Sequence, residues 1–251
     1  MKLLTLARDL RRRKARDRQG LFVVEGVRAV EELLRSPLAV RGALVAPQLL
    51  DAPRGIALRA ALDAARVDVA EVTTRDFASA AETESPQGIL AVAAVPERSL
   101  DTLLLTDPAR LLVLDAVQDP GNVGTILRTA AALGAAATVA LPGTVDVWNA
   151  KVVRSAMGAH FRHPAFHCTW EALDAFRAER GVALWAADAA GTALGDLDAP
   201  PRLALVVGNE GAGVSAEARA RAAAIAALPM VGAESLNVAV AAGIFLYQLR
   251  P

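Results

Sequence analysis

The chain has 251 residues, of which 54% are hydrophobic and 22% are charged, with equal numbers of basic and acidic side chains. This composition excludes a largely disordered protein, and no apolar run reaches the roughly 20 residues that a membrane-spanning helix needs. The single cysteine, Cys168, excludes an intramolecular disulfide framework, and the basic N-terminus lacks the apolar stretch of a signal peptide, so we expect a cytoplasmic protein.

Positive charge is concentrated at the start of the chain, where residues 1–20 carry a net charge of +6. Such a block favours contact with a nucleic acid, because basic side chains that neutralise phosphates release condensed counterions. A solvated amphipathic helix with Leu3, Leu6 and Leu10 facing inward is the alternative. The candidate nucleic-acid contacts are Arg8, Arg11, Arg12, Arg13, Lys14, Arg16 and Arg18.

A first series of strands and helices follows this basic helix. Apolar runs predict strands over 21–26, 40–46, 67–72 and 87–95. Helical spacing of apolar residues predicts helices over 27–36, 56–65 and 74–81. The alternation indicates a small α/β domain over 1–98, and the Pro-, Leu- and charge-containing stretch that follows is interpreted as a linker over 99–109.

A second α/β series occupies 110–251. Strands are predicted over 111–115, 136–141, 165–168, 182–187, 203–207 and 224–228. Helices are predicted near 122–133, 149–157, 170–180, 215–222 and 235–249. This pattern is typical of a sheet with helices on its faces, in which ligands bind beyond the carboxyl ends of the strands.

Two loops that follow strands of this second series contain residues suited to ligand binding. In the first, Asn122 can cap a helix, and Arg128 interrupts an otherwise apolar and small helix face. In the second, glycines at 208, 211 and 213 allow close approach of the backbone to a ligand, although neither the dinucleotide nor the P-loop fingerprint is met. Glu210 would repel a phosphate, so a cation, amine or hydroxyl is its expected partner; a tight turn before a helix capped by Ser215 is the alternative.

A third loop runs through Pro229, Met230 and Gly232 to Ser235 and Asn237, at the start of an apolar C-terminal helix. These polar residues are either helix caps or part of a ligand site. Since all three loops follow strands of one domain, their side chains could converge on a single crevice.

The three loops also resemble the ordered motifs of a known family. The segments N-V-G-T-I-L-R-T (122–129), V-V-G-N-E-G-A-G-V-S (206–215), and L-P-M (228–230) with S-L-N-V-A-V-A-A-G-I (235–244) are similar to those of the SpoU (TrmH-like) family of SPOUT RNA 2′-O-ribose methyltransferases. Residues 149–164 resemble the family's linker between its first two motifs. Residues 6–34 resemble the ribosomal-protein-like (L30e-like) RNA-binding domain of many members.

The resemblance implies an α/β C-terminal trefoil-knot (SPOUT) methyltransferase domain with a smaller N-terminal α/β RNA-binding domain. It implies S-adenosylmethionine as cofactor, RNA as substrate, most often 23S rRNA, and a homodimer formed through the C-terminal domain. The alternatives are a tRNA 2′-O-methyltransferase, a non-catalytic RNA-binding or ribosome-assembly protein, and a small-molecule methyltransferase, which the basic N-terminus disfavours.

The resemblance also assigns residues. Its catalytic polar set corresponds to Asn122, Arg128, Glu210, Ser235 and Asn237. Its cofactor contacts correspond to Gly208, Leu228, Met230, Ser235 and Leu236. Because arginine stays protonated near pH 7 and is a poor general base, we favour Arg128 as a clamp on a phosphate and on the developing alkoxide, with proton abstraction left open.

The remaining candidates favour structural roles. His160, His163, His167 and Cys168 cluster in sequence, but their spacing matches no standard zinc site, so no metal is expected. The tryptophans at 148, 170 and 185 are interpreted as core or interface residues, and Glu25 as a structural residue of its turn.

Overall fold

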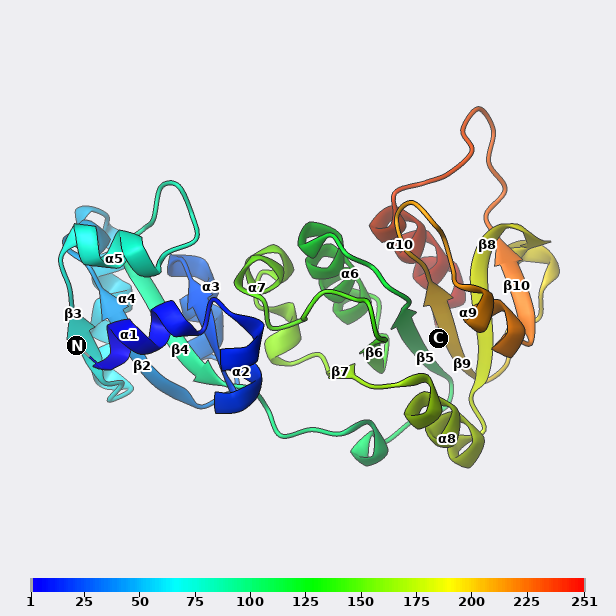
Figure 1. Ribbon diagram of the computed structural model, residues 1–251, viewed down its shortest axis with the longest axis horizontal. Coiled ribbons are helices and arrows are strands. Elements are labelled where there is room, and N and C mark those ends of the chain that lie inside the picture. The colour runs from blue at the N-terminus through cyan, green and yellow to red at the C-terminus, as the bar shows by residue number, and fades with distance from the viewer. Residues whose placement is uncertain (1, 251) are drawn as a thin grey trace. The chain divides into compact units, whose positions relative to one another are not determined.

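The computed structural model describes residues 2–250, which form two compact units (Figure 1). The first unit comprises the chain up to residue 97 together with Trp148–Arg162. The second unit comprises Arg98–Val147 and the chain from residue 163 onward. The chain therefore passes between the units three times, and a segment of the expected 110–251 domain packs with the first unit.

The first unit is built on a four-stranded sheet in the order β1-β4-β2-β3. Its elements are α1 (Lys2–Asp9), α2 (Arg13–Gln19), β1 (Leu21–Glu25), α3 (Val27–Leu34), β2 (Val40–Val45), η1 (Pro47–Asp51), α4 (Pro53–Ala64), β3 (Val69–Glu71), α5 (Thr74–Ala80), β4 (Ile89–Ala94), α7 (Ala150–Ala156) and η3 (Ala159–Phe161). Every predicted strand of this region is present. The basic segment forms two short helices rather than one, because the chain turns between Asp9 and Arg13.

The central strand β4 is apolar throughout because both faces of the sheet are covered. Leu90 and Val92 pack with Leu10 and Phe77, which come from the α1 and α5 side. On β1, Phe22 is fully buried against Trp148 and Phe161, with ring centroids 4.5 and 6.1 Å away. The segment after residue 147 thus contributes aromatic side chains to the core of the first unit.

The second unit contains a six-stranded, all-parallel sheet in the order β10-β8-β9-β5-β6-β7. Its elements are η2 (Leu100–Thr102), β5 (Ala109–Leu114), α6 (Pro120–Ala132), β6 (Ala137–Ala140), β7 (Ala165–His167), α8 (Trp170–Arg180), β8 (Ala183–Ala193), η4 (Leu194–Asp196), β9 (Arg202–Val207), α9 (Ala216–Arg221), β10 (Ala224–Ala227) and α10 (Val238–Leu249). The predicted strands and helices are confirmed, with β8 extending further than expected. The loop between β10 and α10 projects from this unit (Figure 1).

The helix caps agree with the sequence-based expectation at α9 and α10 and differ from it at α6. Asp119 rather than Asn122 caps α6, since its Oδ1 accepts the Asn122 N–H at 2.8 Å and Pro120 occupies the first turn. Of the two polar residues expected at the start of α10, Asn237 forms the cap by accepting the N–H groups of Ala239 and Val240. Ser215 caps α9 as predicted. Asn122 and Ser235 therefore have no capping role, whereas Asn237 is both a cap and a residue of the predicted polar set.

Several residues have the structural roles expected of them. Trp148, Trp170 and Trp185 are buried, and the buried Glu25 carboxylate accepts hydrogen bonds from the Glu82 N–H and the Thr83 hydroxyl. Burial lowers the pKa of His163 to about 4, which leaves its ring neutral at pH 7 and bonded to Thr138 at 2.9 Å.

Neither a membrane span nor a metal cluster is found within residues 2–250. No helix there is long and apolar enough to cross a bilayer. The same residues contain no group of three or more His, Cys, Asp or Glu side chains that could hold a metal ion.

Candidate active site

A cavity of about 540 Å³ lies in the second unit, beyond the carboxyl ends of β9 and β10 and beside the start of α10. Its volume is in the range of small-molecule sites in proteins. The five residues expected to bind the cofactor all line it, namely Gly208, Leu228, Met230, Ser235 and Leu236. Glu210 and Asn237, from the expected polar set, line it as well.

Asn209 shapes the loop on one side of this cavity. Its Oδ1 accepts the N–H groups of Gly211 and Ala212 at 2.9 and 3.0 Å, and its Nδ2 donates to the Ala116 carbonyl at 2.9 Å. The backbones of Asn209 and Gly213 close the loop with two further bonds of 2.9 Å. Asn209 is not among the residues predicted from the sequence, although Asn between glycines after a strand is a recognised turn signal.

Gly208 is required by the loop's own backbone. A Cβ at this position would lie 2.1 Å from the Gly213 carbonyl carbon and 2.2 Å from the Val214 nitrogen, and neither backbone atom can rotate away. This internal closure requires glycine at 208, in addition to the approach to a ligand that the sequence suggests for a residue lining the cavity.

A Gly208→Ala variant is consequently expected to displace the loop 209–213 and to weaken cofactor binding at least about tenfold, since overpacking forces the backbone to shift. Isothermal titration with S-adenosylmethionine measures this, with Gly195→Ala as control because a Cβ at 195 meets no heavy atom within 4 Å. Equal affinities in the two variants would contradict the steric argument.

Asn122, Glu210 and Asn237 form a continuous chain of hydrogen bonds. Asn237 Nδ2 donates to Asn122 Oδ1 at 2.9 Å, and Asn122 Nδ2 donates to Glu210 Oε1 at 3.0 Å. The Glu210 carboxylate also accepts the N–H groups of Gln118 and Asp119 at 3.2 and 3.0 Å. The structure therefore joins the starts of α6 and α10 to the loop after β9, and so brings the three motif loops together.

These bonds keep Glu210 ionised. Burial favours the neutral acid, but the hydrogen bonds from Asn122 and from the backbone of Glu210, Asp119 and Gln118 outweigh it and lower the pKa of Glu210 below its ordinary value of 4.5. The carboxylate is then a fixed acceptor that orients Asn122 and the loop before α6.

Ser235 and Arg128 occupy different surroundings. Ser235 is exposed on the rim of the cavity. Arg128 is exposed on α6, and it is not one of the described residues that line the cavity. Arg128 is six positions after Asn122, which places the two side chains about 120° apart around the helix.

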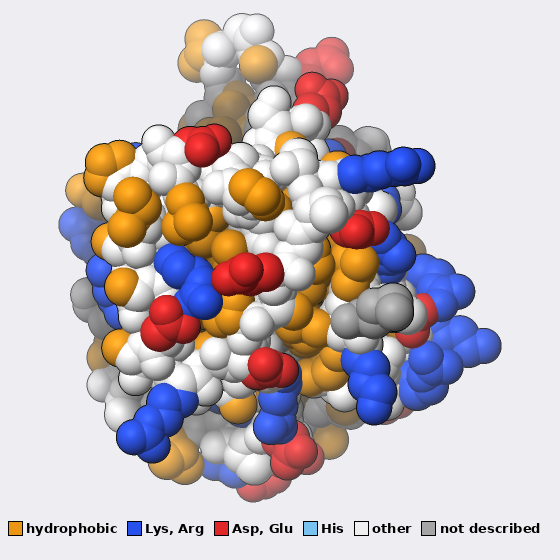
Figure 2. All heavy atoms as spheres, turned by 90° about the vertical axis from the view of Figure 1, so that its left-hand side faces the viewer, with side chains coloured by type: hydrophobic (Ala, Val, Ile, Leu, Met, Phe, Trp, Pro, Cys, Tyr) orange, Lys and Arg blue, Asp and Glu red, His pale blue; other side chains and the backbone are white. Residues whose placement is uncertain are grey.

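Of the seven candidate nucleic-acid contacts in the first unit, five are paired with carboxylates. Arg8 contacts Asp76, Arg11 contacts Glu82, and Arg13 contacts Asp17. Arg12 and Arg18 both contact Asp9, and Lys14 is exposed. On the face of this unit seen in Figure 2, basic and acidic side chains are accordingly interspersed.

Arg16 differs from the other candidates because it is only 4% exposed. Its guanidinium donates to the carbonyls of Leu10 and Arg11 at 2.8 and 2.9 Å, which fixes the turn between α1 and α2. This geometry gives Arg16 a structural role, in place of the nucleic-acid contact suggested by the sequence.

Comparisons with known proteins agree with this geometry. A family model described as the SpoU rRNA Methylase family matches residues 109–247, and one described as an MRM3-like substrate binding domain matches residues 5–91. The 23S rRNA (guanosine(2553)-2′-O)-methyltransferase RlmP of Bacillus subtilis is 38% identical over 248 residues, which cover 97% of this chain and 94% of that protein.

Solved structures are similar over nearly the whole chain. The SpoU methyltransferase AviRb from Streptomyces viridochromogenes, in complex with AdoMet, is 29% identical with a TM-score of 0.89 and covers 99% of this chain and 96% of its own. An AdoMet-bound rRNA methyltransferase from Sinorhizobium meliloti is 28% identical with a TM-score of 0.85, covering 98% and 93%. The family and cofactor expected from the three motifs are thereby confirmed, and the chain belongs to the SpoU rRNA methylase family of S-adenosylmethionine-dependent methyltransferases.

Proposed function

We propose that this protein methylates a ribose 2′-hydroxyl of 23S rRNA. The observation that carries the proposal is the hydrogen-bonded chain Asn237–Asn122–Glu210 at the edge of a cavity whose lining includes every expected cofactor contact. The near full-length similarity to a 23S rRNA 2′-O-methyltransferase supports the choice of substrate.

The cavity suits S-adenosylmethionine in size and lining. Leu228, Met230 and Leu236 offer apolar contacts, and the loop after β9 offers backbone groups beside them. When bound, the cofactor supplies an electrophilic methyl group on a sulfonium. The residues of the chain have the remaining task of holding the ribose hydroxyl in line with that methyl group, which supplies much of the rate in such transfers.

The polar set would divide this task. Glu210 and Asn122 fix one another and so define the position of the α6 N-terminus, and Asn237 links it to α10. Ser235 on the rim offers a hydroxyl to the substrate. Arg128 would stabilise the developing alkoxide and the neighbouring phosphate as a fixed cation.

The first unit would hold the RNA. Arg8 and Arg12 line a hollow of about 440 Å³ together with Gln19, and each guanidinium is oriented by a neighbouring carboxylate. We retain Arg8, Arg11, Arg12, Arg13, Lys14 and Arg18 as phosphate contacts. A 2′-hydroxyl substrate requires RNA rather than DNA, and rRNA as substrate is consistent with a cytoplasmic location.

The experiment for this proposal combines binding with transfer. Calorimetry is expected to show binding of S-adenosylmethionine to wild type and to Arg128→Ala alike, whereas methyl transfer to 23S rRNA is expected to fall at least about a hundredfold in the variant. Cofactor binding without transfer to any rRNA or tRNA would favour a non-catalytic RNA-binding protein.

The resemblance implies a homodimer, and the second unit has a candidate surface for it. Val240, Ile244 and Tyr247 on α10 are 51%, 37% and 58% exposed and lie on one helix face. With Thr125 and Thr129 of α6 they line an apolar groove of about 410 Å³. Arg128 lies about 60° from Thr125 around α6, so a second copy seated in this groove would lie beside it.

Sedimentation is expected to give twice the 26.1 kDa mass of the chain. Ile244→Asp should shift the protein to monomer, because a charge in an apolar interface is desolvated without a partner. Ile56→Asp is the matched control, since Ile56 is an exposed isoleucine on α4. A monomeric wild type, or a dimeric Ile244→Asp, would contradict this assignment.

The trefoil knot stays a prediction of the resemblance.

A further inference from the structure

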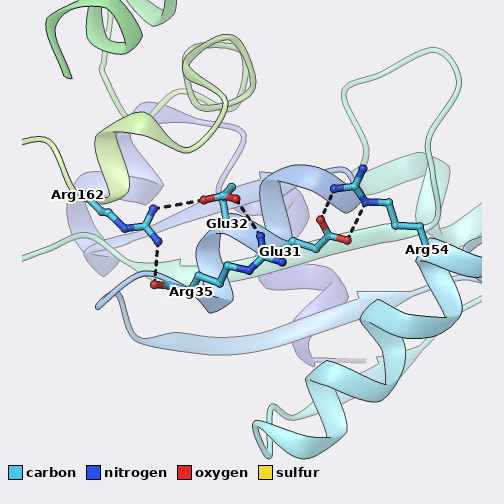
Figure 3. A network of polar contacts seen from close by, with 5 residues as sticks. All are labelled: Glu31, Glu32, Arg35, Arg54 and Arg162. Carbon is cyan, nitrogen blue, oxygen red and sulfur yellow. Dashed lines mark hydrogen bonds and ion pairs between the residues drawn. The ribbon is translucent and has the colours of Figure 1, made fainter. Parts of the chain in front are cut away.

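The segment Trp148–Arg162 is held firmly in the first unit at both of its ends. Trp148 and Phe161 pack against Phe22, and the Arg162 guanidinium donates to Glu32 Oε2 at 3.3 Å and to the Arg35 carbonyl at 2.9 Å. Figure 3 shows the polar contacts of Arg162, in which Glu32 also accepts a hydrogen bond from Arg35 at 3.1 Å. Helix α7 therefore lies between two fixed points of the first unit.

The same segment is joined to the second unit through the chain on either side. Just before it, the Val147 N–H donates to His167 Nε2 at 3.2 Å, and just after it, His163 bonds to Thr138 at 2.9 Å. The SpoU family match, residues 109–247, includes the whole segment. The segment that includes α7 therefore continues at both of its ends into the second unit, so a ligand bound to α7 would be bound by part of the methyltransferase chain.

Helix α7 carries two cations that differ from those of α1 and α2. Lys151 and Arg154 are three residues apart and share a helix face. Within residues 2–250, neither side chain has an ion pair or hydrogen bond, whereas five arginines of α1, α2 and the turn between them contact carboxylates. Arg154 Nη1 is moreover buried with no acceptor.

Cations without a carboxylate partner at a protein surface attract anions, and a bound phosphate would give Lys151 and the accessible part of the Arg154 guanidinium the acceptors that the fold does not provide. We propose that α7 is a second RNA-binding surface, on which Lys151 and Arg154 each contact a backbone phosphate. The inference rests on the proposed function for its choice of RNA as the anion. An ammonium as a point charge and a guanidinium as a two-pronged donor both suit phosphate oxygens.

The test is binding of a 23S rRNA transcript over a range of NaCl concentrations. Lys151→Ala/Arg154→Ala is expected to lose about ten- to a hundredfold in affinity, and its slope of log K against log salt should become shallower by about 1.4–1.8, which corresponds to two phosphates. Arg154→Lys should keep the wild-type slope because it keeps the charge. The control Arg41→Ala/Arg75→Ala removes two exposed cations of the same unit from β2 and α5, and should change affinity less than about threefold.

An unchanged salt slope in Lys151→Ala/Arg154→Ala, or an equal loss in the control, would overturn the inference. If the double variant does not fold, Lys151→Ala alone decides the matter, because this exposed side chain should account for one phosphate. A polyglutamate peptide that displaces the transcript as effectively as unlabelled RNA does would indicate an acidic protein partner. This result would also overturn the inference. Should the wild type transfer no methyl group, the proposed function fails, while the salt slopes still decide whether α7 binds RNA.

Discussion

An Arg110→Ala variant is expected to melt roughly 5–15 °C below the wild type, which corresponds to a loss of about 2–4 kcal/mol in the free energy of unfolding. Arg110 is only 8% exposed at the start of β5. Its Nε donates to the Leu249 carbonyl at 2.6 Å, and its Nη1 donates to the carbonyls of Pro200 and Pro201 at 3.1 and 2.8 Å. The variant removes the donor of the buried bond to the Leu249 carbonyl and of the part-buried bond to the Pro200 carbonyl, whereas the Pro201 carbonyl keeps the Ala109 N–H.

The effect matters for function because Leu249 is the last residue of α10. Carbonyls at a helix C-terminus have no partner within the helix, and Arg110 provides one from the central sheet. The first residues of α10 follow Asn237, which lines the cofactor cavity. Arg110 therefore fixes one end of a helix whose other end shapes the site.

Scanning calorimetry measures the change, and Arg250→Ala is the matched control. Arg250 caps the same helix end by donating to the Tyr247 carbonyl at 2.7 Å, but it is exposed, so its loss should cost less than about 1 kcal/mol. Similar melting temperatures for the two variants would show that the buried hydrogen bonds of Arg110 do not account for the expected loss in the free energy of unfolding.

A Glu210→Ala variant is expected to lose at least about a hundredfold in kcat/KM for methyl transfer. The carboxylate accepts one side-chain and two interresidue backbone hydrogen bonds, from Asn122, Gln118 and Asp119. Charge-assisted bonds of this kind are worth about 1.5–3 kcal/mol each, and 1.4 kcal/mol is a factor of ten. Without these hydrogen bonds, the α6 N-terminus and the Asn122 side chain are no longer held in position.

Glu217→Ala provides the comparison, since Glu217 is an exposed glutamate paired with Arg221 on α9. Steady-state methyl transfer is the measurement, and a Glu210→Ala enzyme as active as Glu217→Ala would contradict the assigned role.

The same carboxylate predicts an acid-sensitive contribution to stability. Because the folded state lowers the pKa of Glu210, its contribution is complete above the ordinary value of 4.5 and is lost as the pH falls through the lower, folded value. Unfolding curves of wild type and Glu210→Gln are therefore expected to differ near pH 7 and to converge in strong acid. If the difference in unfolding free energy between the two proteins stayed constant down to pH 2, it would contradict a lowered pKa of Glu210.

The fold could largely be predicted because apolar periodicity alone separates strands from helices here. The continuous apolar runs at 203–207 and 111–114 became the buried parallel strands β9 and β5. Caps were less certain because several polar residues precede each helix. The dipeptide Asp119–Pro120 does match the preferred cap and first-turn residues, so this cap could have been predicted.

The site was only partly predictable for a different reason. Motif residues could be assigned by resemblance, but the roles of Asn209 and Gly208 depend on a loop that closes on the Ala116 carbonyl and on Gly213. The membership of Trp148–Arg162 in the first unit depends on the ring contact between Phe22 and Trp148, which are 126 positions apart. No local pattern encodes such long-range contacts.

Mapping of ribose methylation in 23S rRNA from cells with and without the gene tests the central claim most directly. We predict that one 2′-O-methylated nucleotide is lost without the gene, returns with the wild-type protein, and does not return with Arg128→Ala. An identical methylation map in both cell types would contradict the assignment to 23S rRNA, and loss of a methyl group from tRNA alone would transfer the activity to that substrate.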